Sequence, residues 1–119
     1  MSNRDKTYHC TIDLSLNLIG GKWKLRILYE LNKGTKRFGE LKKRIPNITQ
    51  KMLVQQLREM EDDRLITRKV YPQVPPKVEY SSTDYGKKFQ IILISLCEWT
   101  NEYAKEQGIQ IDVTEDLEN

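Results

Sequence analysis

The chain has 119 residues, 38% of them apolar and 31% charged, and a net charge of +3, which indicates one folded domain and excludes a disordered chain. It contains no run of about 18 apolar residues and starts without a signal-peptide pattern, so we expect a cytoplasmic protein with no membrane partner. Its single histidine and two cysteines show no metal-ligand spacing, so neither a metal site nor a disulfide framework is expected.

The charge is distributed unevenly along the chain. Residues 22–77 carry fifteen Lys and Arg against six Asp and Glu, whereas residues 98–119 carry one Lys against seven acids. A basic middle and an acidic end suit a molecule with one surface that faces a polyanion. A solvated surface with unevenly distributed charge would give the same counts. The counts alone therefore do not distinguish such a surface from one that faces a polyanion.

Along the chain, residues 1–10 are expected to form a flexible arm, residues 11–107 one domain, and residues 108–119 an acidic tail. The first predicted helix covers Thr11 to Ile19 and carries apolar residues on two sides. Two apolar sides on so short a helix indicate burial between two bodies. Gly20 and Gly21 end it, and a second helix is predicted from Lys22 to Asn32.

A helix-turn-helix is predicted next. A short helical pattern at Phe38 to Ile45 is followed by a turn at Pro46-Asn47 and by a longer helix with Thr49 as its N-cap. Leu53, Leu57 and Met60 share one side of that helix at helical spacing and are predicted to face the core. The opposite side and the first turn supply the predicted major-groove contacts, which are Thr49, Gln50, Lys51, Gln55 and Arg58.

Two strands, Leu65 to Tyr71 and Lys77 to Ser81, are predicted after the fourth helix, with prolines in the loop between them that mark an exposed tip. A basic hairpin beside a recognition helix is typical of a wing, which contacts the sugar-phosphate backbone. The predicted backbone contacts are Arg68, Lys69 and Lys77, with Arg37, Lys22 and Lys24 as weaker candidates. For each single lysine, a solvated charge explains the residue equally well.

The last predicted helix runs from Asp84 to Gln107, and its apolar residues recur at spacings of three and four. Ile91, Leu93 and Ile94 widen this apolar side beyond the need of one small core. We therefore expect a homodimer formed through the first and last helices. The predicted fold class is α+β, mainly α: a winged helix-turn-helix with an N-terminal and a long C-terminal dimerisation helix.

The segments LIGGKWKLRILYEL, RFGELKKRI, KMLVQQLREME and VPPKVEYSST, followed by DYGKKF, resemble the HxlR-type winged-helix transcription regulators from about Cys10 to Trp99. The resemblance implies a bacterial-type homodimer that binds palindromic operators in double-stranded DNA. Two residues depart from the family pattern. Arg64 replaces a usual glycine, which would cost about 1 kcal/mol if the backbone there is left-handed. Ser82 replaces a usual leucine, and we expect looser packing at the end of the second strand.

Some members of this family sense oxidants, quinones or aldehydes through a cysteine just before the first helix, and Cys10 occupies that position. The helix N-terminus and Lys6 favour a thiolate there, whereas Asp13 opposes it. Cys10 is therefore a candidate redox sensor, with a packing role as the alternative. Cys97 lies on the apolar side of the last helix and is predicted to be a core residue.

Three other functions are alternatives to a DNA-binding regulator of this type. A winged-helix protein-interaction module without DNA binding should show aromatic residues or leucines on the outward face of the fourth helix, which is polar and cationic here. A regulator controlled by a small-molecule effector at the dimer interface is compatible with the aromatic residues of the last helix. An enzyme is the weakest alternative, because His9 lies in the arm and no catalytic residue pair or cofactor motif is found.

Overall fold

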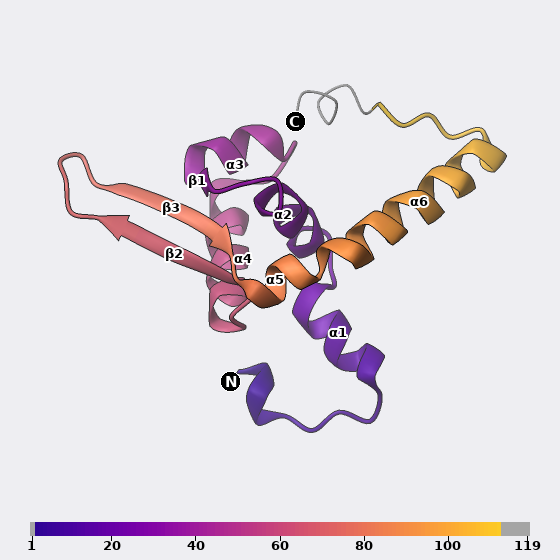
Figure 1. Cartoon of the computed structure of the whole chain (residues 1–119), viewed down its shortest axis with the longest axis horizontal. Helices are drawn as coiled ribbons and strands as arrows, with labels where there is room; N and C mark the ends of the chain where they lie inside the picture. Colours follow the sequence, from indigo (N-terminus) through magenta and orange to yellow (C-terminus); the bar gives the residue numbers. More distant parts are fainter. Residues whose placement is uncertain (1, 113–119) are drawn as a thin grey trace. The chain divides into compact units, whose positions relative to one another are not determined.

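The computed structural model of the protein describes residues 2–112 and divides into two units, one up to Lys87 and one from Lys88 onward (Figure 1). The first unit contains a short 3-10 helix η1 (Asn3–Asp5), the elements α1 (Thr11–Ile19), α2 (Lys24–Leu31), β1 (Lys36–Arg37), α3 (Phe38–Arg44), α4 (Gln50–Asp62), β2 (Ile66–Tyr71) and β3 (Lys77–Ser82), and all but the last residue of α5 (Asp84–Lys88). The second unit contains α6 (Gln90–Gln107). This is the predicted winged helix-turn-helix, with α3 and α4 as its two helices and the β2–β3 hairpin as its wing.

The prediction of one helix from Asp84 to Gln107 is wrong in one respect, because α5 ends at Lys88 and α6 begins at Gln90. Between them Phe89 has a ψ of −10°, and its carbonyl accepts the N–H groups of both Ile92 and Leu93 at 3.0 Å, so a 3-10 and an α-helical hydrogen bond share one acceptor. Phe89 stays in the right-handed region, so the apolar spacing continues across the break. Periodicity alone therefore could not reveal it.

The core of the first unit lies between α2, α3 and α4. Its fully buried side chains are Ile27, Leu28, Leu41, Ile45, Ile48, Leu53, Leu57, Met60 and Ile66. This confirms the predicted inner face of α4, and burial of each such aliphatic side chain contributes about 1.5–3 kcal/mol. Because these contacts fix the rotation of α4 about its axis, they also fix which residues of the helix face outward.

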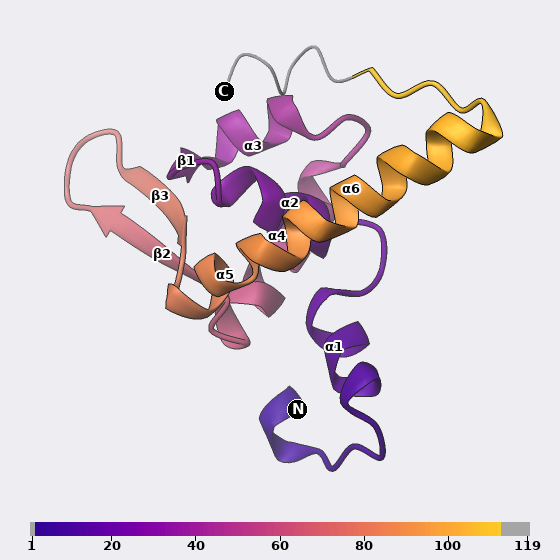
Figure 2. The same ribbon diagram turned by 45° about the vertical axis from the view of Figure 1, so that its right-hand side comes forward.

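The three strands form an antiparallel sheet in the order β1-β3-β2. The β2–β3 hairpin extends away from the helices of the first unit in both views (Figures 1 and 2). Strand β1 was not predicted, because two residues are too few to show an alternating pattern. It pairs Lys36 with Tyr80 and Arg37 with Glu79, so it joins the middle of β3 to the start of α3.

A buried polar chain connects the end of β3 to α2 and α5. The hydroxyl of Ser82 donates to Oδ1 of Asn32 at 2.5 Å, and the side-chain amide of Asn32 donates to the carbonyl of Gly86 at 3.1 Å. A Cβ atom at position 86 would lie 2.4 Å from the carbonyl oxygen of Leu65, so a glycine is required there. Ser82 is 7% exposed, and its hydrogen bond joins the end of β3 to Asn32; the looser packing expected at this position stays a prediction.

The carboxylate of Glu30 on α2 is fully buried and surrounded by cations. Arg26 donates to one of its oxygens, Nε of Arg44 donates to the other at 2.6 Å, and Nζ of Lys33 lies 3.8 Å away. Burial alone would raise the pKa of Glu30, but the hydrogen bonds from Arg26 and Arg44 hold this pKa below its ordinary value. The cluster joins α2 to the last residue of α3, directly before the turn that leads to α4.

The second unit exposes most of the apolar side chains of α6. Ile91, Ile92, Ile94, Leu96, Trp99 and Tyr103 are between 41 and 71% exposed. Cys97 is exposed as well, so its predicted core position is wrong, because this stretch of α6 is not buried within the single chain. In the part of the chain that the structure describes, no helix combines the length and the hydropathy needed to cross a membrane.

Candidate nucleic-acid interface

The turn between α3 and α4 sets where α4 begins. Asn47 has a φ of 70°, a left-handed conformation that asparagine tolerates better than most residues. Two residues later, Oγ1 of Thr49 accepts the N–H of Met52 at 3.1 Å, which confirms the predicted N-cap. The cap and the buried inner face together present the first turns of α4 outward.

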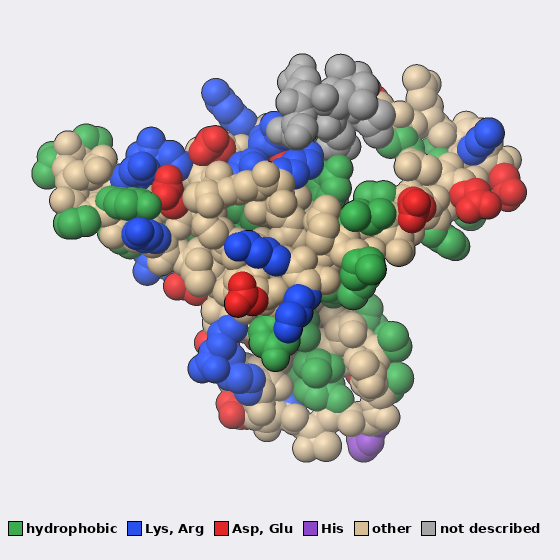
Figure 3. All heavy atoms as spheres, in the orientation of Figure 1, with side chains coloured by type: hydrophobic (Ala, Val, Ile, Leu, Met, Phe, Trp, Pro, Cys, Tyr) green, Lys and Arg blue, Asp and Glu red, His purple; other side chains and the backbone are tan. Residues whose placement is uncertain are grey.

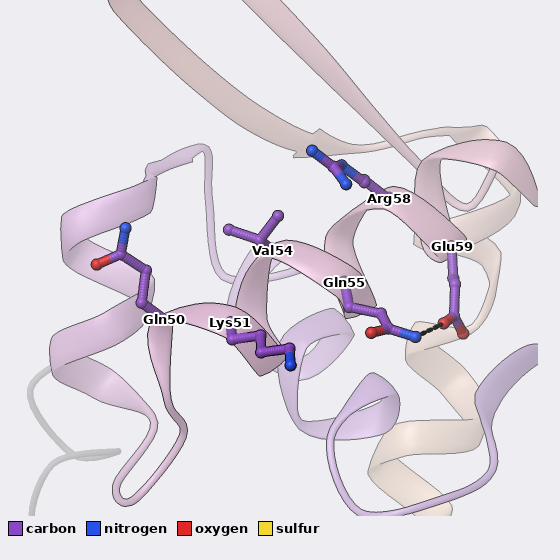
Figure 4. A pocket seen from close by; sticks show the side chains of 6 residues that line it. All are labelled: Gln50, Lys51, Val54, Gln55, Arg58 and Glu59. Atoms are coloured by element: carbon purple, nitrogen blue, oxygen red, sulfur yellow. Dashed lines mark hydrogen bonds between the residues drawn. The ribbon is translucent and has the colours of Figure 1, made fainter.

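The outward face of α4 consists of two rows of side chains, each with residues four positions apart (Figure 4). One row is Gln50, Val54 and Arg58, and the other is Lys51, Gln55 and Glu59. These six residues line an open surface hollow. The predicted contacts Gln50, Lys51, Gln55 and Arg58 are all exposed. Val54 and Glu59 were not predicted, although their spacing of four from Gln50 and Gln55 placed them in the same rows.

The row with Arg58 borders the hairpin. Val54 and Arg58 line a second hollow together with Glu61, Arg68 and Tyr80. Within it, Nε of Arg68 lies 3.6 Å from a carboxylate oxygen of Glu61. Burial raises the pKa of Tyr80, and the nearby charges of Arg68 and Arg58 act in the opposite direction. Arg68 therefore lies at the junction of helix and hairpin, not at the far end of the wing.

The other row borders α2. The side-chain amide of Gln55 donates to Oε2 of Glu59 at 3.1 Å, and Nζ of Lys24 lies 2.7 Å from Oε1 of the same carboxylate. The side chain of Lys24 is only 11% exposed. The hydrogen bond from Lys24 is the largest cause that lowers the pKa of Glu59, burial acts against it, and the bond from Gln55 lowers it further. Lys24, a weaker candidate for a phosphate contact, is thus already paired inside the protein.

The faces of the hairpin separate the predicted wing residues, since successive side chains of a strand point to opposite faces. Lys69 and Tyr71 share one face with their partners Glu79 and Lys77. The ammonium groups of Lys69 and Lys77 lie 4.8 and 4.7 Å from the centre of the Tyr71 ring, whose hydroxyl donates to Glu79 at 2.8 Å. Arg68 belongs to the other face. The alternation of side chains along a strand could have shown this separation from the sequence. The prediction instead treated Arg68, Lys69 and Lys77 as one set of contacts.

The tip of the hairpin is apolar. Val74 is 99% exposed and lies in the loop with Pro72, Pro75 and Pro76. In the space-filling view, hydrophobic side chains occupy the end of the hairpin, and Lys and Arg side chains follow along its flank (Figure 3). Arg37 on β1 pairs with Glu79 in the middle of β3; it is exposed, and its backbone N–H donates to Oε1 of Glu40 at 2.9 Å at the start of α3.

The residues before α1 contact the end of α4. The side-chain amide of Asn3 donates to the carboxylate of Asp63 at 3.0 and 3.2 Å. The hydroxyl of Tyr8 donates to Oδ1 of Asn3 at 3.0 Å and accepts from the amide of Asn17 on α1 at 3.2 Å. Residues 3–8 thus connect α1 to the recognition helix.

Both cysteines are free and exposed, and Cys10 is the N-cap residue of α1. Its backbone carbonyl accepts the N–H of Asp13 at 3.0 Å. Within residues 2–112, no group of three or more His, Cys, Asp or Glu side chains could hold a metal ion. Cys10 therefore combines an accessible sulfur with a position at the start of a helix.

Comparison with known proteins places this geometry among helix-turn-helix regulators. A family model described as HxlR-like helix-turn-helix matches residues 18–108. The HTH-type transcriptional regulator YkvN of Bacillus subtilis (strain 168) is 53% identical over 102 residues, which cover 86% of each chain. A crystal structure of the HTH-type regulator ytcD is 51% identical with a TM-score of 0.78 and covers 81% of this chain and 98% of the other. The redox regulator HypR in its oxidized form is 46% identical with a TM-score of 0.74, over 78% and 96% of the two chains.

Proposed function

This chain belongs to the HxlR-like helix-turn-helix family and is a DNA-binding transcription regulator, and we propose that it binds a palindromic operator as a homodimer. In this proposal α4 enters the major groove, and the β2–β3 hairpin contacts the sugar-phosphate backbone. The protein acts in the cytoplasm, where its DNA is found.

The outward face of α4 is the observation that supports major-groove binding best. Lys51, Gln55 and Arg58 are exposed on the side opposite to Leu53 and Leu57, and Thr49 and Gln50 are exposed at the start of the helix. Amides and guanidinium groups match the donor and acceptor pattern of base edges, and lysine ammonium groups contact phosphates or guanine. A helix that docks on a protein would instead present large apolar side chains on this face.

The wing residues take different roles in this proposal. Lys69 and Lys77 lie on the same face of the hairpin with both ammonium groups near the ring of Tyr71, where they would contact the same stretch of DNA backbone, and Lys77 also lies 3.5 Å from a carboxylate oxygen of Glu79. Arg37 supplies a further contact to the DNA backbone from β1, where it pairs with Glu79 of β3. Arg68 lies next to Glu61 and completes the surface between helix and hairpin, so its contribution to phosphate binding is smaller.

The dimer is proposed to form through α1 and α6. Ile12 and Leu16 on α1 are each 60% exposed, and α6 exposes six large apolar side chains. Exposed apolar surface of this extent is uncommon on a monomer, and a second copy of the chain would cover it. Two-fold symmetry of the protein then requires a palindromic operator with its half-sites about one helical turn apart.

The proposed control of DNA binding acts through the thiol of Cys10. Cys10 is exposed at the N-cap of α1, and HypR, a relative of similar fold, is named as a redox regulator. The Tyr8–Asn3–Asp63 contacts offer a route from this position to the end of α4. An effector bound at the dimer interface is the alternative.

Fluorescence anisotropy of the reduced protein with the DNA upstream of its own coding region tests the proposal. We expect tight, salt-dependent and sequence-selective binding, compared with a scrambled duplex, that changes after diamide treatment. Selective binding that ignores diamide would favour the effector alternative. Binding without any selectivity on this DNA or on a randomised duplex library would contradict the proposal and favour a protein-interaction module.

A further inference from the structure

We propose that Lys24 and Glu59 are positioning residues that orient the amide of Gln55 for recognition of adenine, an inference that rests on the proposed major-groove binding of α4. Lys24 comes from α2, whereas Gln55 and Glu59 lie in one row of α4 (Figure 4). Neither Lys24 nor Glu59 has to contact DNA in this proposal.

The amide of Gln55 meets Glu59 through its nitrogen. A carboxylate can only accept hydrogen bonds, so the nitrogen of the amide must face it. Nε2 of Gln55 lies 3.1 Å from Oε2 of Glu59, which agrees with this requirement. The contact uses one of the two amide hydrogens and fixes the direction of the amide plane. The amide oxygen and the second N–H remain available to a ligand.

Lys24 keeps Glu59 in place and ionised. Its other oxygen, Oε1, lies 2.7 Å from the ammonium of Lys24, so each oxygen has its own partner. Lys24 is largely buried and belongs to another helix, and its side chain therefore has little freedom to follow a moving carboxylate. The lowered pKa of Glu59 agrees with a group that stays charged at neutral pH. The positive charge of Lys24 also offsets a carboxylate that would otherwise repel DNA phosphates.

An amide held in this orientation selects adenine. A glutamine oxygen and N–H together match the N6 donor and N7 acceptor of adenine in the major groove. If the amide were free to rotate by half a turn, the same side chain could offer its donors or its acceptor to other bases. Because Glu59 fixes one orientation of the Gln55 amide, Glu59 and Lys24 should increase the preference for adenine at one base position of each half-site. They should leave the affinity for the DNA backbone unchanged.

Selection from a randomised duplex library, followed by measured affinities for single-base variants, tests the inference. Gln55→Ala identifies the position that Gln55 reads, where the wild type should prefer adenine by about 5-fold to 150-fold, the range for a good bidentate contact. Glu59→Gln keeps the shape of the side chain but can offer either a donor or an acceptor to Gln55. It should reduce the adenine preference at that position alone, and Lys24→Met should act in the same direction.

Asp62→Asn is the matched control, since it removes one negative charge from the hollow that Lys24 and Glu59 also line without removing the hydrogen bond to Gln55, and it should leave the preference intact. An unchanged preference in Glu59→Gln would overturn the inference. So would a loss of affinity that is equal for all sequences and accompanied by a lower melting temperature, because the pair would then only stabilise the fold. If the wild type selected no sequence, the proposed function itself would fail, which separates the two failures.

Discussion

The guanidinium of Arg44, the last residue of α3, donates to the buried carboxylate of Glu30 on α2 across 2.6 Å. Arg26 donates to the other oxygen of Glu30 and also to the backbone carbonyl of Arg44 at 3.0 Å. The first helix of the helix-turn-helix is thus attached to α2 at its C-terminal end, where cations also suit the helix dipole. The turn into α4 starts from this fixed point.

Glu30→Gln is expected to lower the free energy of unfolding by about 2–4 kcal/mol at pH 7, because it leaves two partly buried arginines without their anion. The pKa of Glu30 in the folded protein lies below the ordinary value of 4.5. Its ionised form therefore adds stability above that value, and this contribution is lost as the pH falls through the lowered pKa. Urea unfolding at fixed protein concentration should show the difference between variant and wild type shrinking at acidic pH. Asp5→Asn serves as the control for charge, and a difference that stays constant down to the acid limit would contradict the assignment.

Arg64→Gly is expected to stabilise the protein by about 0.5–1 kcal/mol, because Arg64 has a φ of 62° and a side chain is strained in that region. The gain should appear as a higher melting temperature in a thermal scan. Arg64→Ala retains the Cβ atom and should give no comparable gain. A lowered melting temperature for the glycine variant, or equal gains for both variants, would refute the strain explanation.

Lys69→Ala is expected to weaken binding to all DNA sequences alike and to reduce the slope of log affinity against log salt by about one. Arg68→Ala should change the slope less, since Arg68 lies on the other face of the hairpin beside Glu61. Anisotropy titrations at several salt concentrations compare the two neighbours directly. Equal changes in slope for the two variants would mean that the face of the hairpin on which a cation lies does not determine whether it contacts the phosphates.

Cys10→Ser is expected to retain DNA binding and to lose its response to diamide, because the exposed thiol at the start of α1 is the proposed oxidation site. Cys97→Ser, which removes the other exposed thiol, should respond as the wild type does. The measurement is operator binding before and after oxidant, with mass spectrometry to identify the modified cysteine. A Cys10→Ser protein that still responded to diamide would exclude this sensor.

Trp99→Ala is expected to weaken the dimer by about 2 kcal/mol, or roughly 30-fold in its dissociation constant, as removal of a central aromatic side chain often does. Trp99 is 64% exposed in the single chain and stacks on Tyr103 with ring centres 5.6 Å apart. Sedimentation over a range of concentrations measures the change. Asn101→Ala on the same helix is the control, and an effect of similar size there would argue against a specific interface at Trp99.

The sequence predicted the elements well where a periodic pattern coincided with a cap or a turn. The helix from Thr11 to Ile19 has the predicted bounds, and the predicted cap at Thr49 is present. Helical spacing also separated the buried from the exposed side of α4. These features depend on neighbours a few residues apart, which a single sequence displays directly.

Features that depend on contacts between distant residues could not be predicted. Nothing local marks Lys24 as the partner of Glu59, because 35 positions separate a residue of α2 from one of α4. The helix break at Phe89 left the apolar spacing intact, and the exposure of Cys97 depends on what covers α6. Of the candidate site, the sequence therefore predicted which side chains face outward, but not what holds them there.

The chain of hydrogen bonds from Ser82 through Asn32 to Gly86 has a consequence for how related sequences vary. A leucine in place of Ser82, the residue expected from the resemblance, could not hydrogen-bond to the side chain of Asn32. A relative with leucine at position 82 and asparagine at position 32 would leave the side-chain oxygen of this asparagine without the donor that Ser82 supplies here, which costs stability. Positions 32 and 82 should therefore covary among relatives, while position 86 stays glycine in both groups.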